Sequence, residues 1–243
     1  STVNGGKPRM SWDVLRTMAK HGHEISNHGW QHRNLGKFPL DEIKTDIDKN
    51  DSVIYAELGV KPLTFAYANN TKKADGMVEV YKHHIASRLL QISLGGKRTA
   101  TDLESRLKQL LKGHGWLVTM THGITYGYDH FTDPNILWNY LKRVKRLEDK
   151  IWVGTFYQVA AYTREEKGVT FDIQQSKGGF TVMPTLYLDK ALYTEPLTGL
   201  VAQKGLKILS VMQSGQKLKT REVGGEYQFD FNPFGGLITI KTD

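Results

Sequence analysis

Apolar positions in the first two-thirds of the chain alternate between helical spacing and short continuous runs. A spacing of three or four residues predicts helices over 12–20, 39–58, 75–84 and 101–112, another from 134, and a last one over 156–165. Short apolar runs predict strands over 23–27, 63–67, 86–94, 116–121 and 151–155. This alternation predicts an α/β fold with a parallel sheet, open or closed into a barrel. Five strands are few for a closed barrel.

Capping residues mark several of these helix ends. Ser11 is the predicted N-cap of the first helix, and Gly59 is the predicted stop of the second. The sequence Thr101-Asp-Leu-Glu104 is typical of a capping box that opens the helix over 101–112. Asp133 followed by Pro134 predicts another helix start, because proline is favoured at the first helical position.

The pattern changes after Gly168. Five strand-like segments follow without an intervening helix, at 169–173, 180–188, 205–213, 227–231 and 237–241. Turns rich in glycine separate them. We therefore predict two domains, an α/β domain over 1–166 and a small all-β module, similar to a sandwich, over 167–243.

The composition limits the kinds of partner that this chain is expected to bind. No apolar run reaches the ~18–20 residues that cross a bilayer, so no membrane span is expected. The chain has no cysteine, which excludes disulfides and thiolate metal ligands. The net charge of +8 raises nucleic-acid binding as a hypothesis. The basic residues are spread out, however, and the densest group is typical of a solvated helix face, so no nucleic-acid partner is predicted. That group is Lys142, Arg143, Lys145 and Arg146.

Two histidines are candidate metal ligands. His28 and His32 stand four residues apart just after a predicted strand, and a helical turn would point both imidazoles at one divalent ion. The spacing alone is weak, because a chain with nine histidines often contains such a pair by chance. His23 and Glu24 do not form a metalloprotease motif, since position 27 is not histidine. Glu24 is interpreted as a structural carboxylate.

Two further polar residues end predicted strands. His122 follows the run 116–121, and Tyr67 ends the run 63–67. Ligands bind at the carboxyl ends of parallel strands, so both are candidate catalytic residues. Alternatively, His122 only caps its strand and Tyr67 only packs in the core. Convergence with His28 and His32 at one edge would favour an active site.

The segment His21–Leu35, HGHEISNHGWQHRNL, closely resembles one of the polysaccharide deacetylase family, the NodB-homology carbohydrate esterases. His28 and His32 fall on the two metal-binding histidines of that segment, and Leu35 falls on its closing leucine. Gly29 stands where the family usually has Ser or Thr.

Two other segments resemble motifs of the same family. Leu117–His122 resembles an apolar strand that ends in Leu-x-His, which implies that His122 is the general acid. Phe65-Ala66-Tyr67 resembles a motif that is commonly Phe-Ala-Tyr-Pro, which implies that the Tyr67 backbone N–H helps to hold the oxyanion. Ala68 replaces the proline of that motif.

The resemblance covers about residues 1–166. It implies an irregular (β/α) barrel of the polysaccharide deacetylase type, incomplete at its amino end, followed by the all-β module. It implies a metal-dependent hydrolase that removes N- or O-acetyl groups from an acetylated polysaccharide or oligosaccharide, with a divalent metal, usually Zn²⁺, as cofactor. Such glycans lie outside the cytoplasm, so a secreted, periplasmic or cell-surface location is expected, although no signal peptide is visible. The oligomeric state is left open.

One departure from the family matters for activity. Its first motif, Thr-Phe-Asp-Asp-Gly, supplies the catalytic base and the third metal ligand, and no such sequence occurs in this chain. The chain has therefore either lost an amino-terminal section or naturally lacks the motif. The alternative to a hydrolase is a non-catalytic, carbohydrate-binding relative of the deacetylases.

Overall fold

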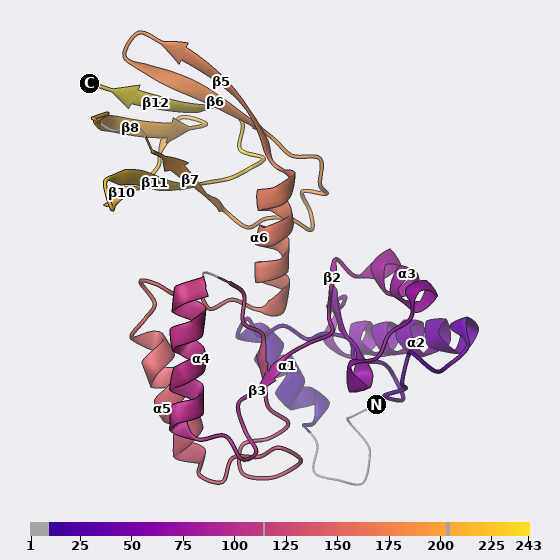
Figure 1. Ribbon diagram of the computed structural model, residues 1–243. Helices are drawn as coiled ribbons and strands as arrows, with labels where there is room; N and C mark the ends of the chain where they lie inside the picture. The colour runs from indigo at the N-terminus through magenta and orange to yellow at the C-terminus, as the bar shows by residue number, and fades with distance from the viewer. Residues whose placement is uncertain (1–9, 114, 203–204) are drawn as a thin grey trace. The chain divides into compact units, whose positions relative to one another are not determined.

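The computed structural model describes residues 10–113, 115–202 and 205–243 (Figure 1). The chain divides into two compact units, Ser1–Tyr157 and Gln158–Asp243, and the division falls inside helix α6 (Phe156–Gly168). We call them unit 1 and unit 2. The domain limits expected from the sequence, 1–166 and 167–243, stay a prediction.

The predicted helices of unit 1 are confirmed. They are α1 (Trp12–Lys20), α2 (Leu40–Leu58), α3 (Ala74–His83), α4 (Ala100–Gly113) and α5 (Pro134–Lys145), followed by the start of α6. Ser11 accepts the Val14 N–H at 3.4 Å, and Gly59 ends α2 with φ 69°. Asp133 accepts the Asn135 N–H at 2.9 Å.

The predicted capping box of α4 is wrong by two residues. The side chain of Asp102 accepts the Thr99 N–H at 2.8 Å, and the Thr99 hydroxyl accepts the Asp102 N–H at 3.2 Å. These are the reciprocal bonds of a capping box, and they let α4 begin at Ala100. Glu104 is free of the cap and instead forms an ion pair with Arg143, at 3.3 Å.

The strands of unit 1 are shorter than the apolar runs that predicted them. β1 (Thr64–Ala66) pairs with β2 (Ala86–Arg88), and β3 (Ile92–Ser93) pairs with β4 (Thr119–Met120), both in parallel. The predicted strand 23–27 is reduced to a parallel bridge from Asn27 to Phe65. A short 3₁₀ turn, Ala68–Asn70, follows β1. The described part of unit 1 is therefore a mixed α/β fold, without a closed barrel.

Two strand predictions in unit 1 are wrong. The run 116–121 forms strand only at β4, and Trp116 is 46% exposed, so the run is not buried. The run 151–155 forms no strand, and Trp152 is 51% exposed. A strand needs a ladder of hydrogen bonds to a neighbouring strand, and none of the sheets of the described residues includes 151–155.

Two apolar cores stabilise unit 1. The first joins α2, α3 and β1 to the loop after the histidine segment, and its buried residues are Leu35, Ile43, Ile47, Phe65, Tyr67 and Val80. The second lies between α4, α5 and the loops beside β3 and β4, and its buried residues are Leu94, Leu103, Phe131 and Leu137. Leu35, the last residue of the motif, is 1% exposed, so the motif is anchored in the first core.

Unit 2 is a sandwich of two antiparallel sheets, as predicted. The larger sheet has the order β5-β6-β12-β8-β9 and the smaller β10-β11-β7. Their strands are β5 (Thr170–Ser176), β6 (Gly179–Thr185), β7 (Leu197–Val201), β8 (Ile208–Gln213), β9 (Gln216–Lys217), β10 (Thr220–Val223), β11 (Glu226–Phe231) and β12 (Ile238–Thr242). The core joins Val211, Ile238 and Ile240 of the larger sheet to Leu197, Phe229 and Phe231 of the smaller.

The sequence did not predict β7, β9 and β10. All four residues of β10 and both residues of β9 are exposed, so neither strand carries an alternating apolar pattern. In β7, Gly199 interrupts the pattern, and it pairs with Phe229. A Cβ at position 199 would lie 2.8 Å from the Phe229 ring, which explains why glycine is needed there.

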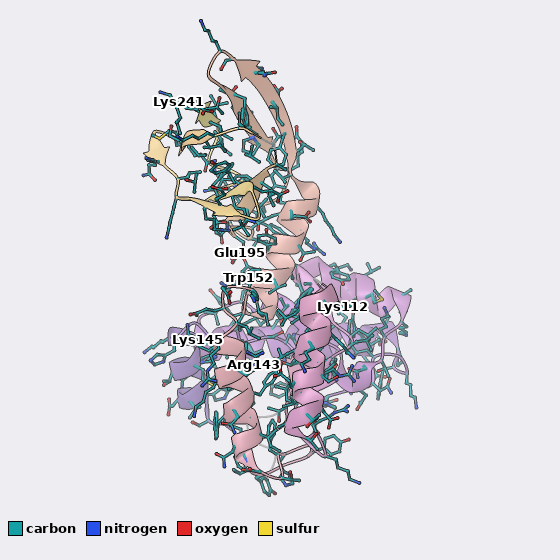
Figure 2. The ribbon with its side chains drawn as sticks, turned by 60° about the vertical axis from the view of Figure 1, so that its left-hand side comes forward. Lys112, Arg143, Lys145, Trp152, Glu195 and Lys241 are labelled. Carbon is teal, nitrogen blue, oxygen red and sulfur yellow. The ribbon has the colours of Figure 1, made fainter. Side chains whose placement is uncertain are left out.

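The basic group of α5 lies on a solvated helix face, as predicted. Lys142, Lys145 and Arg146 are exposed, and Lys145 pairs with Glu148. The half-buried Arg143 pairs with Glu104 of α4 (Figure 2). No helix in the described part of the chain is long and apolar enough to cross a membrane.

A buried carboxyl group makes the stability of unit 2 depend on pH. Burial is the main reason that the pKa of Glu165 is raised from 4.5 to about 7; the hydrogen bond from the Glu195 N–H opposes this rise, and the negative charge of Glu195 adds to it. One Glu165 oxygen accepts the Glu195 N–H at 3.2 Å. The folded state therefore holds this proton more tightly than the unfolded state, so unit 2 loses stability as pH rises from 4.5 to about 7.

We expect Glu165→Gln to remove this pH dependence. At pH 8 the variant should be more stable than the wild type by about 2–3 kcal/mol, and at pH 4.5 the two should be similar. Hydrogen exchange of the β8 and β12 amides, followed by mass spectrometry, measures this difference. Glu166→Gln alters an exposed neighbour and should change nothing. A wild-type unit 2 that is equally stable at pH 5 and pH 8 would contradict the assignment.

Candidate functional site

The structure brings His28 and His32 together. Their ring centroids lie 4.8 Å apart, with the rings edge to face at 86°. His28 Nδ1 lies 2.6 Å from the Ala66 carbonyl oxygen at the end of β1. A carbonyl only accepts, so Nδ1 carries the proton and Nε2 keeps its lone pair in the neutral ring. This is the arrangement by which metal-binding histidines are usually oriented.

The surroundings of His28 favour the neutral ring. Burial lowers the pKa of His28, and the positive charges of His32, Arg88 and His122 lower it further, against the hydrogen bond to Ala66. Only a neutral imidazole binds a metal ion. His28 follows the Asn27 bridge, Arg88 ends β2 and His122 follows β4, so all three residues lie at the carboxyl ends of strand segments.

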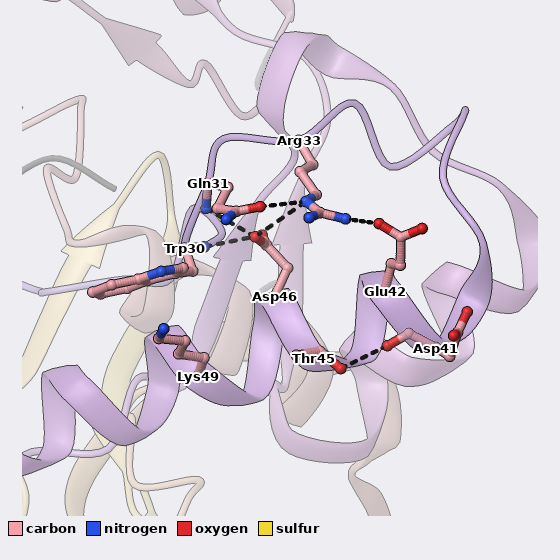
Figure 3. Close-up of a pocket in the computed structure, with 8 residues that line it drawn as sticks. All are labelled: Trp30, Gln31, Arg33, Asp41, Glu42, Thr45, Asp46 and Lys49. Carbon is pink, nitrogen blue, oxygen red and sulfur yellow. Dashed lines mark hydrogen bonds and ion pairs between the residues drawn. The ribbon is translucent and has the colours of Figure 1, made fainter.

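The turn between the histidines is not the helical one that the spacing suggested. His32 has φ 54° and Gly29 has φ 79°, both in the left-handed region. Asp46 of α2, 4% exposed, holds the turn from below: its carboxylate accepts the Trp30 N–H at 2.9 Å and the Gln31 N–H at 2.8 Å (Figure 3). The two rings therefore converge through a tertiary contact with α2.

Asn27 fixes the start of this turn. It is completely buried, and its Nδ2 donates to the Ile47 carbonyl at 3.0 Å and to Asp51 at 2.6 Å. Its Oδ1 accepts the Gly29 N–H at 2.7 Å and the Asn50 side chain at 2.8 Å. A fully satisfied buried amide of this kind makes the local conformation unique.

Gly29 is required by the same packing. A Cβ there would lie 2.5 Å from Asp46 Oδ2, and its φ of 79° disfavours any side chain. The Ser or Thr usual in the family at this position would not fit this turn. Gly22 is a matched control: its φ is 84°, and a Cβ added there would have no atom within 4 Å. A substitution at Gly22 therefore tests the cost of the backbone conformation alone.

We expect Gly29→Ala to destabilise unit 1 much more than Gly22→Ala. The Gly22 substitution should cost about 1 kcal/mol, from the backbone alone. The Gly29 substitution should cost at least about 2 kcal/mol more, because Asp46 cannot move without losing its bonds to the turn. Urea unfolding followed by tryptophan fluorescence reports on unit 1, since all five tryptophans lie within it. Equal losses in the two variants would contradict this account.

Tyr67 lies in the core. Its side chain is 1% exposed, its ring lies 5.2 Å from that of Phe65, and burial raises the pKa of its hydroxyl. Its backbone N–H donates to the Arg88 carbonyl at 3.0 Å, so an oxyanion would have to share or replace this bond. The packing role is confirmed, and the catalytic role stays a prediction.

His122 is exposed in the loop after β4. Its ring centroid lies 5.2 Å from that of Tyr128, at an angle of 77°. The preceding residue, Thr121, donates its hydroxyl to the Gly123 carbonyl at 2.7 Å, which tightens the turn after His122. The ring is thus accessible for proton transfer, and its role as an acid stays a prediction.

Glu24 is a structural carboxylate, as predicted. It accepts a hydrogen bond from the Thr64 hydroxyl of β1 and another, at 2.8 Å, from the Tyr157 N–H at the start of α6. Both of its oxygens are occupied by these contacts, which tie the histidine segment to the end of unit 1.

Sequence reasoning missed Arg88. Burial lowers the pKa of this half-buried guanidinium, which donates to Asn70 at 3.0 Å and to Gln91 at 2.5 Å. Arg88 ends β2, but the sequence predicted one strand over 86–94, so this residue lay inside that run and carried no strand-end signal.

The donor set fits part of a metal site. Two imidazole nitrogens on adjacent rings suit a zinc ion, which is usually held by three or four protein ligands. Within residues 10–113, 115–202 and 205–243, no group of three or more histidine, aspartate, glutamate or cysteine side chains is arranged to hold a metal. His28 and His32 remain candidate metal ligands.

Known proteins share the segment that contains the two histidines. Residues 2–84, which contain both histidines, match the family model of the polysaccharide deacetylases. This segment is therefore similar to the polysaccharide deacetylase family. The uncharacterized protein YlxY of Bacillus subtilis is 34% identical over 64 residues, a match that covers 26% of this chain and 20% of YlxY.

Two solved structures are similar to this chain. A Mycobacterium smegmatis protein assigned as a polysaccharide deacetylase has a TM-score of 0.54 and 15% identity, over 64% of this chain and 68% of its own. A CE4 family pseudoenzyme from Bacillus anthracis has a TM-score of 0.46 and 15% identity, over 61% of this chain and 50% of its own. At such identities the likeness to the Mycobacterium smegmatis protein concerns the fold alone.

Proposed function

We propose that the protein is a metal-dependent hydrolase that removes N- or O-acetyl groups from a polysaccharide. The observation that carries the proposal is the geometry of His28. Its Nδ1–H donates to the Ala66 carbonyl, its Nε2 keeps a lone pair that could bind a metal ion, and the His32 ring centroid lies 4.8 Å from that of His28. The match of residues 2–84 to the polysaccharide deacetylase family model supports the same chemistry.

The metal would be held by His28 and His32, with zinc as the proposed ion. A bound divalent cation supplies Lewis acidity, which activates water and polarises the acetyl carbonyl. The described residues of the chain would orient the two histidine rings toward the metal ion. The Ala66 carbonyl fixes the His28 ring and its tautomer, and Asp46 fixes the turn that carries His32.

His122 is the proposed general acid. It is exposed, follows β4 and lies near enough to His28 for its charge to lower the pKa of that residue. A protonated imidazole there would give its proton to the leaving amine or hydroxyl of the sugar. The backbone N–H of Tyr67 is the proposed oxyanion donor, released from the Arg88 carbonyl when substrate binds.

We also propose that unit 1 is part of the irregular (β/α) barrel of polysaccharide deacetylases. Its parallel ladders run in chain order, from Asn27 to β1 and β2, and from β3 to β4. Helices connect them, as in a barrel built from βα repeats. The apolar segment 151–155, which lies outside the sheets of the described residues, would be a strand in such a barrel.

A non-catalytic, carbohydrate-binding relative is the second candidate. It is favoured because, in the described part of the chain, no third histidine, aspartate, glutamate or cysteine side chain is arranged with the two histidines to hold a metal. In both candidates the partner is an acetylated glycan. Because such glycans lie outside the cytoplasm, a secreted, periplasmic or cell-surface location is part of the proposal.

Acetate release separates the two candidates. The source protein at its full natural length, loaded with zinc, is expected to release acetate from acetylated chito-oligosaccharide. A chelator and His28→Ala should each abolish release, and His122→Ala should lower kcat by about 10²–10⁴-fold. His83→Ala, in the exposed last turn of α3, should leave the rate unchanged. Glycan binding without acetate release would contradict the hydrolase and favour the carbohydrate-binding relative.

A further inference from the structure

The loop after β4 exposes two aromatic side chains beside the candidate acid. Tyr126 is 65% exposed and Tyr128 is 81% exposed. Gly127, with φ 104°, separates them. Large exposed aromatic surfaces that no packing requires are typical of binding sites. We call these two side chains the tyrosine pair.

The backbone that carries the tyrosine pair is fixed. Phe131, 3% exposed, closes the loop by donating its N–H to the Ile124 carbonyl at 3.0 Å. The Gly96 N–H is shared between the carbonyls of Asp129 and His130, at 3.1 and 3.0 Å. The Asp129 carboxylate also accepts the Ser93 hydroxyl at the end of β3. The tyrosines are therefore presented by an anchored loop.

The loop also depends on a close approach of two backbones. A Cβ at Gly95 would lie 2.0 Å from the Asp129 carbonyl oxygen, so only glycine permits this packing. Asp129 itself has φ 64°. The loop is thus held against the end of β3. His122 follows β4, the strand that pairs with β3.

Tyr128 contacts the candidate site directly. Its ring lies 5.2 Å from that of His122. A ligand lying over Tyr128 would therefore be adjacent to the candidate acid. Tyrosine combines an apolar ring face with a hydroxyl that can hydrogen-bond at its edge.

We propose that the tyrosine pair is a stacking surface for pyranose rings of the acetylated glycan, next to the sugar that carries the reacting acetyl group. The inference rests on the proposed function of the His28 site, and it names the substrate contact of that site. One face of a pyranose ring presents C–H groups, which pack on an aromatic ring, while its hydroxyls point outward to water. Two exposed rings on a fixed loop suit a chain of such sugars better than a single small molecule.

Binding of penta-N-acetylchitopentaose to the whole chain tests the inference, measured by isothermal titration calorimetry with zinc and again after chelation. Tyr128→Ala should weaken binding by about tenfold, and the double variant with Tyr126→Ala should weaken it further. Tyr128→Phe keeps the ring and should remain within about twofold of wild type. Tyr55→Ala removes an exposed tyrosine of α2, 60% exposed, and should leave binding unchanged.

The outcomes distinguish this inference from the proposed function. If the wild type does not bind the pentamer, or Tyr128→Ala binds as well as wild type, the tyrosine pair is not the stacking surface, whatever the metal site does. An equal loss from Tyr55→Ala would also overturn it. Binding that needs the tyrosine pair and persists without zinc supports the stacking surface, even if zinc does not bind and the hydrolase proposal fails.

Discussion

His28→Ala is expected to weaken zinc binding by more than about 100-fold, because it removes a protein ligand whose orienting hydrogen bond is already in place. His32→Ala should have a similar effect, since the ring that it removes lies 4.8 Å from that of His28. Isothermal titration calorimetry of the purified chain with zinc measures both affinity and stoichiometry. The wild type should bind one ion per chain at this site.

The control for this experiment is His83→Ala. His83 is an exposed histidine in the last turn of α3, so the variant removes an imidazole without touching the candidate site. Its zinc affinity should stay within about twofold of wild type. Zinc binding that survives in both His28→Ala and His32→Ala would mean that the ion binds elsewhere on the chain.

Asn27→Ala is expected to destabilise unit 1 by about 3–5 kcal/mol. The substitution removes four hydrogen bonds made by a completely buried side chain. It leaves the Gly29 N–H and the buried Asn50 amide without their partner, and each unsatisfied buried group costs about 1–3 kcal/mol. Because a domain is stable by only about 5–15 kcal/mol, part of unit 1 should be unfolded.

Urea unfolding followed by tryptophan fluorescence measures this loss in unit 1. The control is Asn34→Ala, whose side chain makes one local bond, accepting the Gly36 N–H at 3.2 Å. That variant should lose less than about 1 kcal/mol. Asn27→Asp should be as damaging as Asn27→Ala, since it places a carboxylate 2.6 Å from Asp51. If Asn27→Ala lost less than about 1 kcal/mol, the buried network would not be what shapes the turn.

The helices could be predicted because their signals are local. Ser11, Gly59 and Asp133 act within a few residues of the helix ends that they mark. The start of α4 shows how such signals compete. Thr99 with Asp102 and Thr101 with Glu104 both fit a capping pattern, and the earlier pair forms the cap.

The strands were harder to predict because a segment forms a strand only when it pairs with another segment through hydrogen bonds. The runs 116–121 and 151–155 are both apolar enough to form strands. Within the described residues, only part of the first run, β4, belongs to a sheet. Apolar composition shows that a segment is able to form a strand, while hydrogen-bonded pairing depends on segments distant in sequence. The same reason explains why β7 became visible only through its pairing with β11.

The sequence predicted which histidines form the candidate site, but it did not predict the geometry that brings them together. The spacing of His28 and His32 suggested a helical turn, whereas the rings converge through left-handed residues held by Asp46. The Asp46 contact and most of the Asn27 network have no local signature, because these partners lie on α2, 15 to 24 positions away. Arg88 was missed because it lies inside the predicted run 86–94, which the structure divides into β2 and β3.

The central claim is that His28 and His32 bind one metal ion through their imidazole nitrogens. X-ray absorption spectroscopy of the zinc-loaded chain tests it most directly. We expect two imidazole ligands at about 2.0–2.1 Å, with oxygen atoms completing the shell. The imidazole signal should disappear in His28→Ala and persist in His83→Ala. A zinc spectrum without imidazole scattering in the wild type would contradict the account.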